Sequence, residues 1–152
     1  MKNNAVRLVL TVVTLVLGAA GEELLPKALG VGFPLLLGAV VYFAVRFPVS
    51  TAILVALGAG AAEDAISGLP FFTSVSFFLL VGAAVRLTQL PYLVAPLAFP
   101  LYQVWLCLWT LDLSGSVFTR ILLSIPLGVL TVAVVAAVLH HVERKAAVNE
   151  AA

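Results

Sequence analysis

The sequence has few charged residues. Its 152 residues include 8 Lys and Arg and 7 Asp and Glu, so charged residues make up 10% of the chain, against 63% hydrophobic residues and a mean hydropathy of +1.21. A soluble globular domain carries about 25% charged residues. This scarcity excludes an ordinary soluble domain and predicts an integral membrane protein. The net charge is only +1 and there is no basic patch, so nucleic-acid binding is not indicated.

Cysteine and histidine are also scarce, with 1 Cys and 2 His in the chain. Cys107 lies inside an apolar run, and a single cysteine forms neither an intramolecular disulfide nor a metal cluster. His140 and His141 are adjacent, so on a helix they point about 100° apart and make a poor metal pair. The sequence contains no phosphate-binding loop, zinc spacing or serine–histidine–aspartate set. We therefore predict a protein without enzymatic activity, cofactor or metal.

Long apolar runs fill almost the whole chain. No gap between them exceeds roughly ten residues, which is too few for a soluble domain with its own core. A helix needs about 20 residues to cross about 30 Å of hydrocarbon, so the shorter runs must include their polar ends. We predict a single all-α transmembrane domain over 1–152, a six-helix bundle with a short cytoplasmic tail at 141–152. The predicted spans cover about 5–21, 31–45, 49–67, 70–87, 91–111 and 117–140.

The charges in the gaps alternate in sign, and this orients the chain. Lys and Arg concentrate on the cytoplasmic side of membrane proteins. With both termini in the cytoplasm, most acids fall in the outer gaps, and the outer basic residues are only Lys27 and Arg120. We therefore predict that both termini are cytoplasmic. The basic residues on the inner side are then Lys2, Arg7, Arg46, Arg86, Arg144 and Lys145.

The N-terminal run has an alternative interpretation. Lys2 and Arg7, the apolar stretch after them and the small residues Gly18-Ala19-Ala20 also fit a cleavable signal peptide. Keeping the segment as a span gives an even number of spans and leaves both termini on the positive side. We therefore interpret it as the first span.

Proline marks the fifth run. Pro91, Pro96 and Pro100 predict a helix that is bent or broken in its cytoplasmic half. A broken helix lines a substrate cavity in some transporters, but proline is also common in ordinary membrane helices. Tyr102 and Gln103 are the most polar side chains of this run, and we expect an interhelical hydrogen bond from them.

The acidic turn after the third run is the best candidate for a specific role. The run 49–62 covers only about 21 Å as a helix. Extending it through Ser67 places Glu63 and Asp64 about one turn below the membrane surface, where they must face protein or water. Gly68 then ends the helix. Two roles are open for the acids: contact with a partner, a proton or a substrate, or capping of a helix end.

Small residues precede Asp64 at intervals of four. Ala52, Ala56, Gly60 and Asp64 therefore share one face of a helix. Small side chains let a second helix approach closely. We predict that this face packs against a neighbouring helix and that Asp64 points into the bundle.

A further pair of charges flanks the start of the last span. Arg120 lies one turn into the span and Asp112 lies in the loop before it. An ion pair between them is one interpretation. The favoured alternative is that Arg120 extends to the outer surface by itself.

The acidic turn and the layout resemble the rod shape-determining protein MreD family of the bacterial cell-elongation machinery. That family has about six apolar spans, a basic cytoplasmic end, and an apolar helix that ends in Asp-x-x-small-Gly-x-x-x-Gly. Asp64, Ser67 and Gly68 match the first half of this motif. Phe72 stands where the family usually has the second glycine.

The resemblance implies a non-enzymatic scaffold in the bacterial inner (cytoplasmic) membrane. Its implied partners are MreC and, through it, the MreB cytoskeleton, the RodA glycosyltransferase and the elongation transpeptidase, which direct lateral peptidoglycan synthesis and cell shape. It also implies the six-helix fold of the substrate-binding S components of energy-coupling-factor vitamin transporters, and a vitamin-binding S component is the alternative function. The bulky first run, Val6–Leu17, lacks the small-residue docking face that this alternative needs. A proton or ion pathway through Glu63 and Asp64 is the third hypothesis, but no further polar row continues it.

Overall fold

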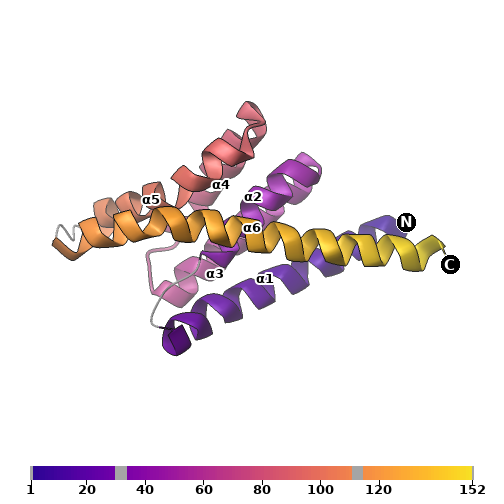
Figure 1. The fold of residues 1–152 in the computed structure, drawn as a ribbon, viewed down its shortest axis with the longest axis horizontal. Helices are drawn as coiled ribbons and strands as arrows, with labels where there is room; N and C mark the ends of the chain where they lie inside the picture. The colour runs from indigo at the N-terminus through magenta and orange to yellow at the C-terminus, as the bar shows by residue number, and fades with distance from the viewer. Residues whose placement is uncertain (1, 30–33, 111–114, 152) are drawn as a thin grey trace.

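The computed structural model describes residues 2–29, 34–110 and 115–151, and within these ranges it contains six α-helices and no strand (Figure 1). The all-α prediction is confirmed. The apolar runs form the helices, and Gly68, with φ of 63°, ends the third helix in the left-handed conformation that glycine adopts most easily. The helices are α1 (Lys2–Leu29), α2 (Leu35–Arg46), α3 (Val49–Ser67), α4 (Thr73–Thr88), α5 (Pro91–Thr110) and α6 (Gly115–Ala151).

Three helices are long and apolar enough to cross a membrane: Leu8–Leu25 within α1, Val49–Ser67, and Ile121–Val142 within α6. The apolar helices α2, α4 and Val94–Thr110 of α5 are shorter. With 12 residues, α2 rises only about 18 Å, well short of about 30 Å of hydrocarbon. The helices therefore fall into a long class and a short class.

The helices differ from the predicted spans at several points. α1 continues past the predicted end at 21 as far as Leu29, and α4 begins at Thr73 and not at 70. α2 begins at Leu35, after Pro34, and the residues predicted to start this span lie outside the described ranges. α5 is one continuous helix with Pro96 and Pro100 inside it, so the prolines do not break it. The segment predicted as a tail, 141–152, continues α6 as far as Ala151.

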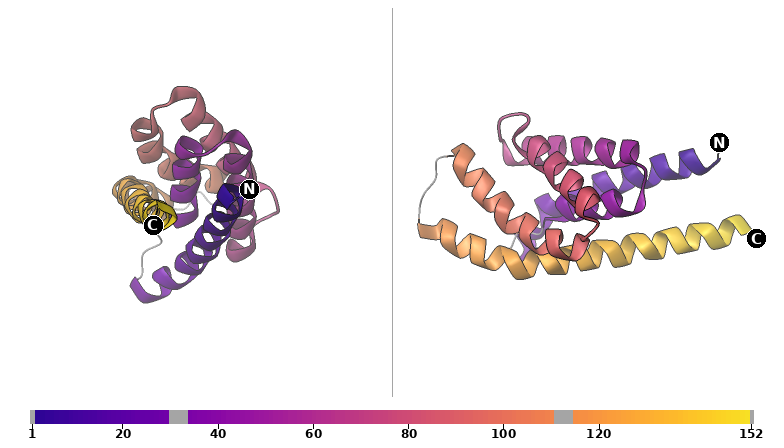
Figure 2. Two further views of the ribbon diagram at one scale, coloured as in Figure 1. Left: turned by 90° about the vertical axis from the view of Figure 1, so that its right-hand side faces the viewer. Right: turned by 90° about the horizontal axis from the view of Figure 1, so that it is seen from above.

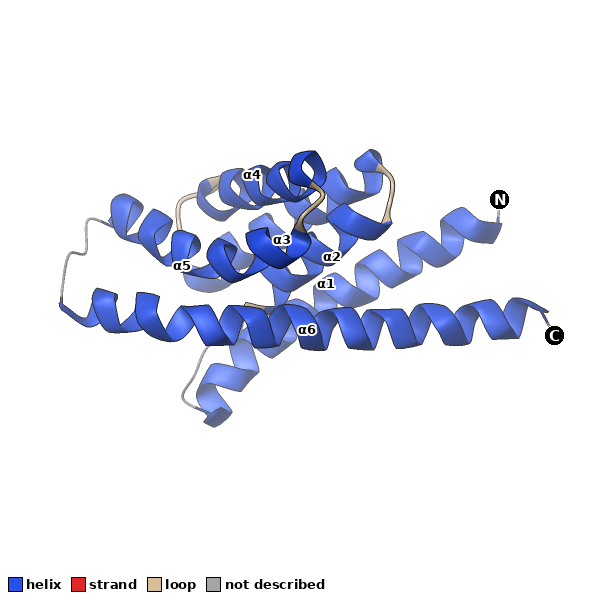
Figure 3. Cartoon of the chain, turned by 45° about the horizontal axis from the view of Figure 1, so that its top comes forward, coloured by secondary structure: helices blue, strands red, loops and turns tan. Residues whose placement is uncertain are grey.

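The short helix α2 is the centre of the packing. It contacts each of the other five helices, and every residue from Leu36 to Ala44 is buried. A helix that is apolar on all sides is stable only when protein or lipid covers every side. α6 runs along one side of the bundle and contacts α2 and α5 (Figure 3). The other helices therefore surround α2 in the order α1, α3, α4, α5, α6, with no contact between the described residues of α1 and α6.

The long helices α1 and α6 extend past the other helices toward the same end of the molecule, so both termini lie at that end (Figure 2). The apolar window of α1 is 0% buried. Large side chains such as Leu8, Val12 and Val16 are exposed along it. Apolar surface of this extent marks contact with a membrane or a partner.

Candidate functional site: an acidic cavity

Asp64 joins α3 to α4. It lies in the last turn of α3 and is 2% exposed, and its Oδ1 accepts a hydrogen bond of 2.7 Å from the backbone N–H of Ser74 in the first turn of α4. The first N–H groups of a helix have no partner inside the helix, and a carboxylate there also interacts favourably with the helix dipole. Oδ2 is buried without a hydrogen-bond partner among the described residues. Of the two roles open for Asp64, the geometry therefore contains a cap, supplied to the following helix.

The small-residue face of α3 lies under the start of α4. Ala52, Ala56 and Gly60 are buried together with Asp64. A Cβ atom at Gly60 would lie 2.6 Å from the backbone nitrogen of Val75 and would overlap its Cα. The two helix backbones thus touch one turn before Asp64, and this close approach brings the Ser74 N–H within reach of the carboxylate.

Glu63 and Tyr102 continue the polar network. Oε1 of Glu63 accepts hydrogen bonds from the hydroxyls of Ser67, at 3.1 Å, and Tyr102, at 3.4 Å. The hydroxyls of Tyr102 and Ser74 lie 2.6 Å apart. Tyr102 comes from α5, so the predicted interhelical hydrogen bond is confirmed. It ties the end of α3, the start of α4 and the middle of α5 together.

Glu22 of α1 repeats the arrangement of Asp64, and the sequence analysis did not single it out. Its Oε1 accepts a 2.7 Å hydrogen bond from the backbone N–H of Leu36 in the first turn of α2. Gly18, one turn earlier, faces the same residue, and a Cβ there would lie 2.9 Å from Cδ2 of Leu36. Gly18-Ala-Ala-x-Glu22 thus parallels Gly60-Ala-Ala-x-Asp64. This repeated Gly-Ala-Ala-x-acid pattern is the feature of the sequence from which Glu22 could have been identified.

These polar groups surround a cavity of about 210 Å³, the acidic cavity, where α1 and α3 end and α2 and α4 begin. Its lining combines two carboxylates, two hydroxyls and an amide with apolar side chains. Such a lining accepts hydrogen bonds from donor groups. Among the described residues, no group of three or more His, Cys, Asp or Glu is arranged to hold a metal ion. The lining residues are Glu22, Pro34, Leu37, Glu63, Ile66, Ser67, Phe78, Phe99, Tyr102, Gln103 and Leu106.

The turn between α3 and α4 forms an exposed tip beside this cavity. Phe71 and Phe72 are 67% and 60% exposed, and their rings meet edge to face with centroids 4.6 Å apart. Ser67 and Gly68 are exposed next to them. We call Ser67, Gly68, Phe71 and Phe72 the aromatic tip. Phe72 has φ of 78°, in the left-handed region that favours glycine.

Replacing Phe72 by glycine is expected to stabilise the fold. A non-glycine residue in the left-handed region costs about 1–2 kcal/mol, and an exposed ring recovers little of that by packing. We expect Phe72→Gly to raise the midpoint of thermal unfolding in detergent by a few degrees. Phe71→Gly is the control, because Phe71 is equally exposed but has no positive φ. Equal shifts in the two variants would show that the backbone of Phe72 is not strained.

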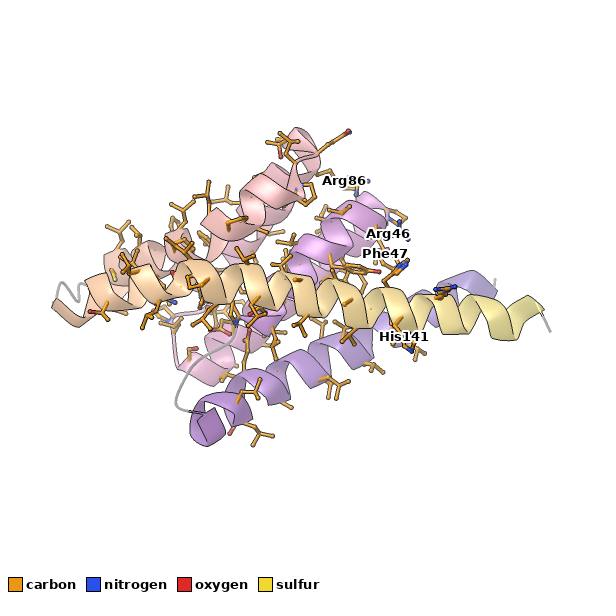
Figure 4. All side chains as sticks on the ribbon, in the orientation of Figure 1. Arg46, Phe47, Arg86 and His141 are labelled. Carbon is orange, nitrogen blue, oxygen red and sulfur yellow. The ribbon has the colours of Figure 1, made fainter. Side chains whose placement is uncertain are left out.

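The other end of α2 is held by Arg86 of α4. Its Nη1 donates to the carbonyl oxygens of Ala44, at 2.9 Å, and Phe47, at 2.6 Å. The last carbonyls of a helix have no partner inside it, and a cation there interacts favourably with the dipole. Figure 4 shows Arg46, Phe47 and Arg86 at the end of α2 nearer the two termini. Side chains from α1 and α4 therefore cap α2 at its two ends.

Both interpretations of Arg120, an ion pair with Asp112 or extension to the outer surface by itself, lie outside what the structure describes, since Asp112 and the side chain of Arg120 are not among the described groups.

Comparison of the chain with protein-family models, curated proteins and solved structures finds no match. Function is therefore inferred from the residues of the chain and their geometry.

Proposed function

We propose that all six helices lie in the membrane and that both termini are cytoplasmic. The exposed apolar surface of α1 supports contact with lipid, and the short helix α2 is enclosed by protein, so it needs no full span. The two termini lie at one end of the molecule (Figure 2). Arg46 and Arg86 belong to that end, and Glu22 and Asp64 belong to the opposite end of α2. This separation of charge agrees with the positive-inside rule.

We further propose that the protein is a non-enzymatic scaffold of the MreD type in a bacterial inner membrane. It would bind a periplasmic protein of the MreC type and, through it, help to position MreB, RodA and the elongation transpeptidase for lateral wall synthesis. The observation that carries this proposal is the backbone of the acidic turn. Phe72, which occupies the second glycine position of the resembling motif, has the positive φ that glycine adopts freely.

The other motif residues also have geometric roles that explain the pattern. Asp64 caps the helix after the turn, and Gly68 ends the helix before it. The turn between α3 and α4 carries the exposed aromatic tip. Exposed aromatic residues are enriched at the centres of protein interfaces. We therefore assign partner binding to the aromatic tip and a structural role to Asp64.

Purification of the tagged protein from its native host in mild detergent, with mass spectrometry of what accompanies it, tests the scaffold. We expect an MreC-type protein with the wild type and at least a tenfold lower recovery with Phe71→Ser, since removing an aromatic side chain that becomes buried on binding costs about 2 kcal/mol or more. The control is Leu87→Ser, because Leu87 is 85% exposed at the other end of α4. Undiminished recovery with Phe71→Ser would remove the aromatic tip from the interface, and absence of an MreC-type protein from the wild type would contradict the scaffold.

A vitamin-binding S component is the second candidate, and the acidic cavity is the observation that favours it. Its polar lining from Glu22, Glu63, Tyr102 and Gln103 could orient a small polar ligand. Its volume of about 210 Å³ is below the range of about 300–1,000 Å³ that is typical of ligand pockets. Gly18 also faces α2 and so offers no docking face on α1. Recovery of a paired ATPase and its membrane coupling protein in the same purification would favour this candidate.

A further inference from the structure

The carboxyl groups of Glu22 and Glu63 meet in the acidic cavity. Both residues line it, Glu22 near the end of α1 and Glu63 near the end of α3. The two side chains are within hydrogen-bond contact of each other, and α1 and α3 pack directly against one another. The packing of the two helices therefore holds two acids side by side.

The donors around Glu22 do not satisfy its carboxyl group. The backbone N–H groups of Leu35 and Leu36 at the start of α2 face it, and that of Leu36 donates to Oε1 at 2.7 Å. Oε2 is buried and has no hydrogen-bond partner among the described residues. A buried carboxylate oxygen without a donor is unfavourable. Glu22 therefore needs one more donor, and the side chain in contact with it is a second carboxyl group.

A proton is the smallest group that supplies this bond. An ionised carboxylate only accepts hydrogen bonds, so two carboxyl groups bond to each other only when one of them carries a proton. Two carboxylates at one site also repel each other, and such pairs share one proton in known enzymes. A metal ion fits less well, because Ca²⁺ takes about six to eight oxygen ligands and the described residues contain no group of three or more His, Cys, Asp or Glu that could hold an ion.

The other charged and titratable side chains of the packed helices do not replace this proton. Asp64 of α3 is a further carboxyl group, and Tyr102 of α5 already donates its hydroxyl to Glu63. Arg46 of α2 and Arg86 of α4 belong to the opposite end of α2 (Figure 4). Among the described side chains, none of the cations is therefore placed to neutralise a second negative charge at the pair.

We propose that Glu22 and Glu63 share one proton and that this proton binds the end of α1 to the end of α3. Loss of the proton would leave two negative charges in contact and would push the two helix ends apart. Glu63 would then move away from Tyr102 and from Ser67 of the aromatic tip, whose hydroxyls it now accepts. The pair is a pH-sensitive contact beside the aromatic tip, and it goes beyond the scaffold function.

Infrared spectroscopy of the purified full chain in detergent tests the proposal, because a protonated carboxyl group has a C=O stretch that an ionised carboxylate lacks. At about pH 7 an ordinary glutamic acid, with a pKa of about 4.3, is ionised. We expect the wild type to retain the band of the shared proton at this pH. Glu22→Gln and Glu63→Gln should each lower the band by one carboxyl per chain, since a glutamine N–H replaces the proton as donor. The double variant should lower it by the same amount and no more.

Glu23→Gln is the matched control, because Glu23 follows Glu22 on α1 but is exposed and does not line the acidic cavity. We expect its band to equal that of the wild type. Wild-type protein that contains ¹³C-labelled glutamate gives a second measurement without any substitution, since its band should shift with the label.

A wild type without a protonated carboxyl group at about pH 7 would overturn the proposal, as would a band that does not shift with labelled glutamate. An unchanged band in the double variant, or additive losses in the two single variants, would also overturn it. The assay needs no protein partner, so its failure leaves the scaffold proposal untouched.

Discussion

Gly60→Ala is expected to destabilise the protein strongly. The added Cβ would overlap backbone atoms of Val75 and not the end of a flexible side chain, so the first turn of α4 would have to move. Overpacking costs about 1–3 kcal/mol. The shift would also lengthen the 2.7 Å hydrogen bond between Asp64 and the Ser74 N–H, and the loss of a helix cap adds about 1 kcal/mol. We expect a fall of many degrees in the thermal midpoint, measured by circular dichroism in detergent.

Gly82→Ala is the control for this variant. Gly82 is also a helical glycine, but a Cβ there would meet only Cγ1 of Val40, at 3.7 Å, which is ordinary contact. Replacing a helical glycine by alanine gains up to about 1 kcal/mol of helix propensity. We therefore expect Gly82→Ala to be neutral or stabilising. If both variants lost stability equally, the close approach of α3 and α4 would not be the cause.

Asp64→Ala is expected to have the second largest effect on stability. It removes the acceptor of the buried Ser74 N–H, and a buried donor without a partner costs about 1–3 kcal/mol. Asp64→Asn keeps an oxygen acceptor and loses only the charge that favours the helix N-terminus, which contributes about 0.3–1 kcal/mol. We therefore expect Asn to retain most of the stability that Ala loses, in the same thermal measurement.

Glu63→Gln tests whether the loss of stability in Asp64→Ala is specific to Asp64 or follows the removal of any carboxylate at the end of α3. Glu63 is half-buried and accepts from two hydroxyls, and the amide oxygen of glutamine can accept the same bonds. We expect a midpoint close to that of the wild type. If the Asp64→Ala variant were as stable as the Glu63→Gln variant, the hydrogen bond from the Ser74 N–H to Asp64 would not stabilise the fold.

The helices themselves could be predicted because apolar runs and charged gaps are local properties of the chain. α3 begins at Val49 and ends at Ser67, as the run, the polar extension and Gly68 indicate. The tail could also have been predicted to be helical, because Ala146 and Ala147 and the charges around them favour a helix. The prediction for 141–152 was only a short cytoplasmic tail, whereas the segment continues α6 as far as Ala151.

The contacts of the polar side chains could not be predicted in the same way. Glu22 accepts from a backbone N–H that lies 14 residues away in another helix, and nothing in the identity of Leu36 marks that donor. Tyr102 and Glu63 are 39 residues apart and meet only when α5 packs beside α3. The acidic cavity therefore depends on the packing of five helices, α1 to α5, whereas its two acids, Glu22 and Glu63, can each be placed near the end of an apolar run from hydropathy alone.

The two caps on α2 also determine the order in which the protein can assemble. With 12 residues, α2 rises only about 18 Å, so in the proposed orientation at least one of its ends would lie within the roughly 30 Å of hydrocarbon, where a peptide group has little access to water. Glu22 is synthesised before α2, but Arg86 follows it by 40 residues, after the whole of α3. During synthesis the C-terminal carbonyls of α2 therefore lack their partner until most of α4 has left the ribosome. We expect α1 to α4 to enter the bilayer as one cooperative unit. α2 would be the first short helix synthesised and the last to reach its final packing, because Arg86 caps it only after α4 is synthesised.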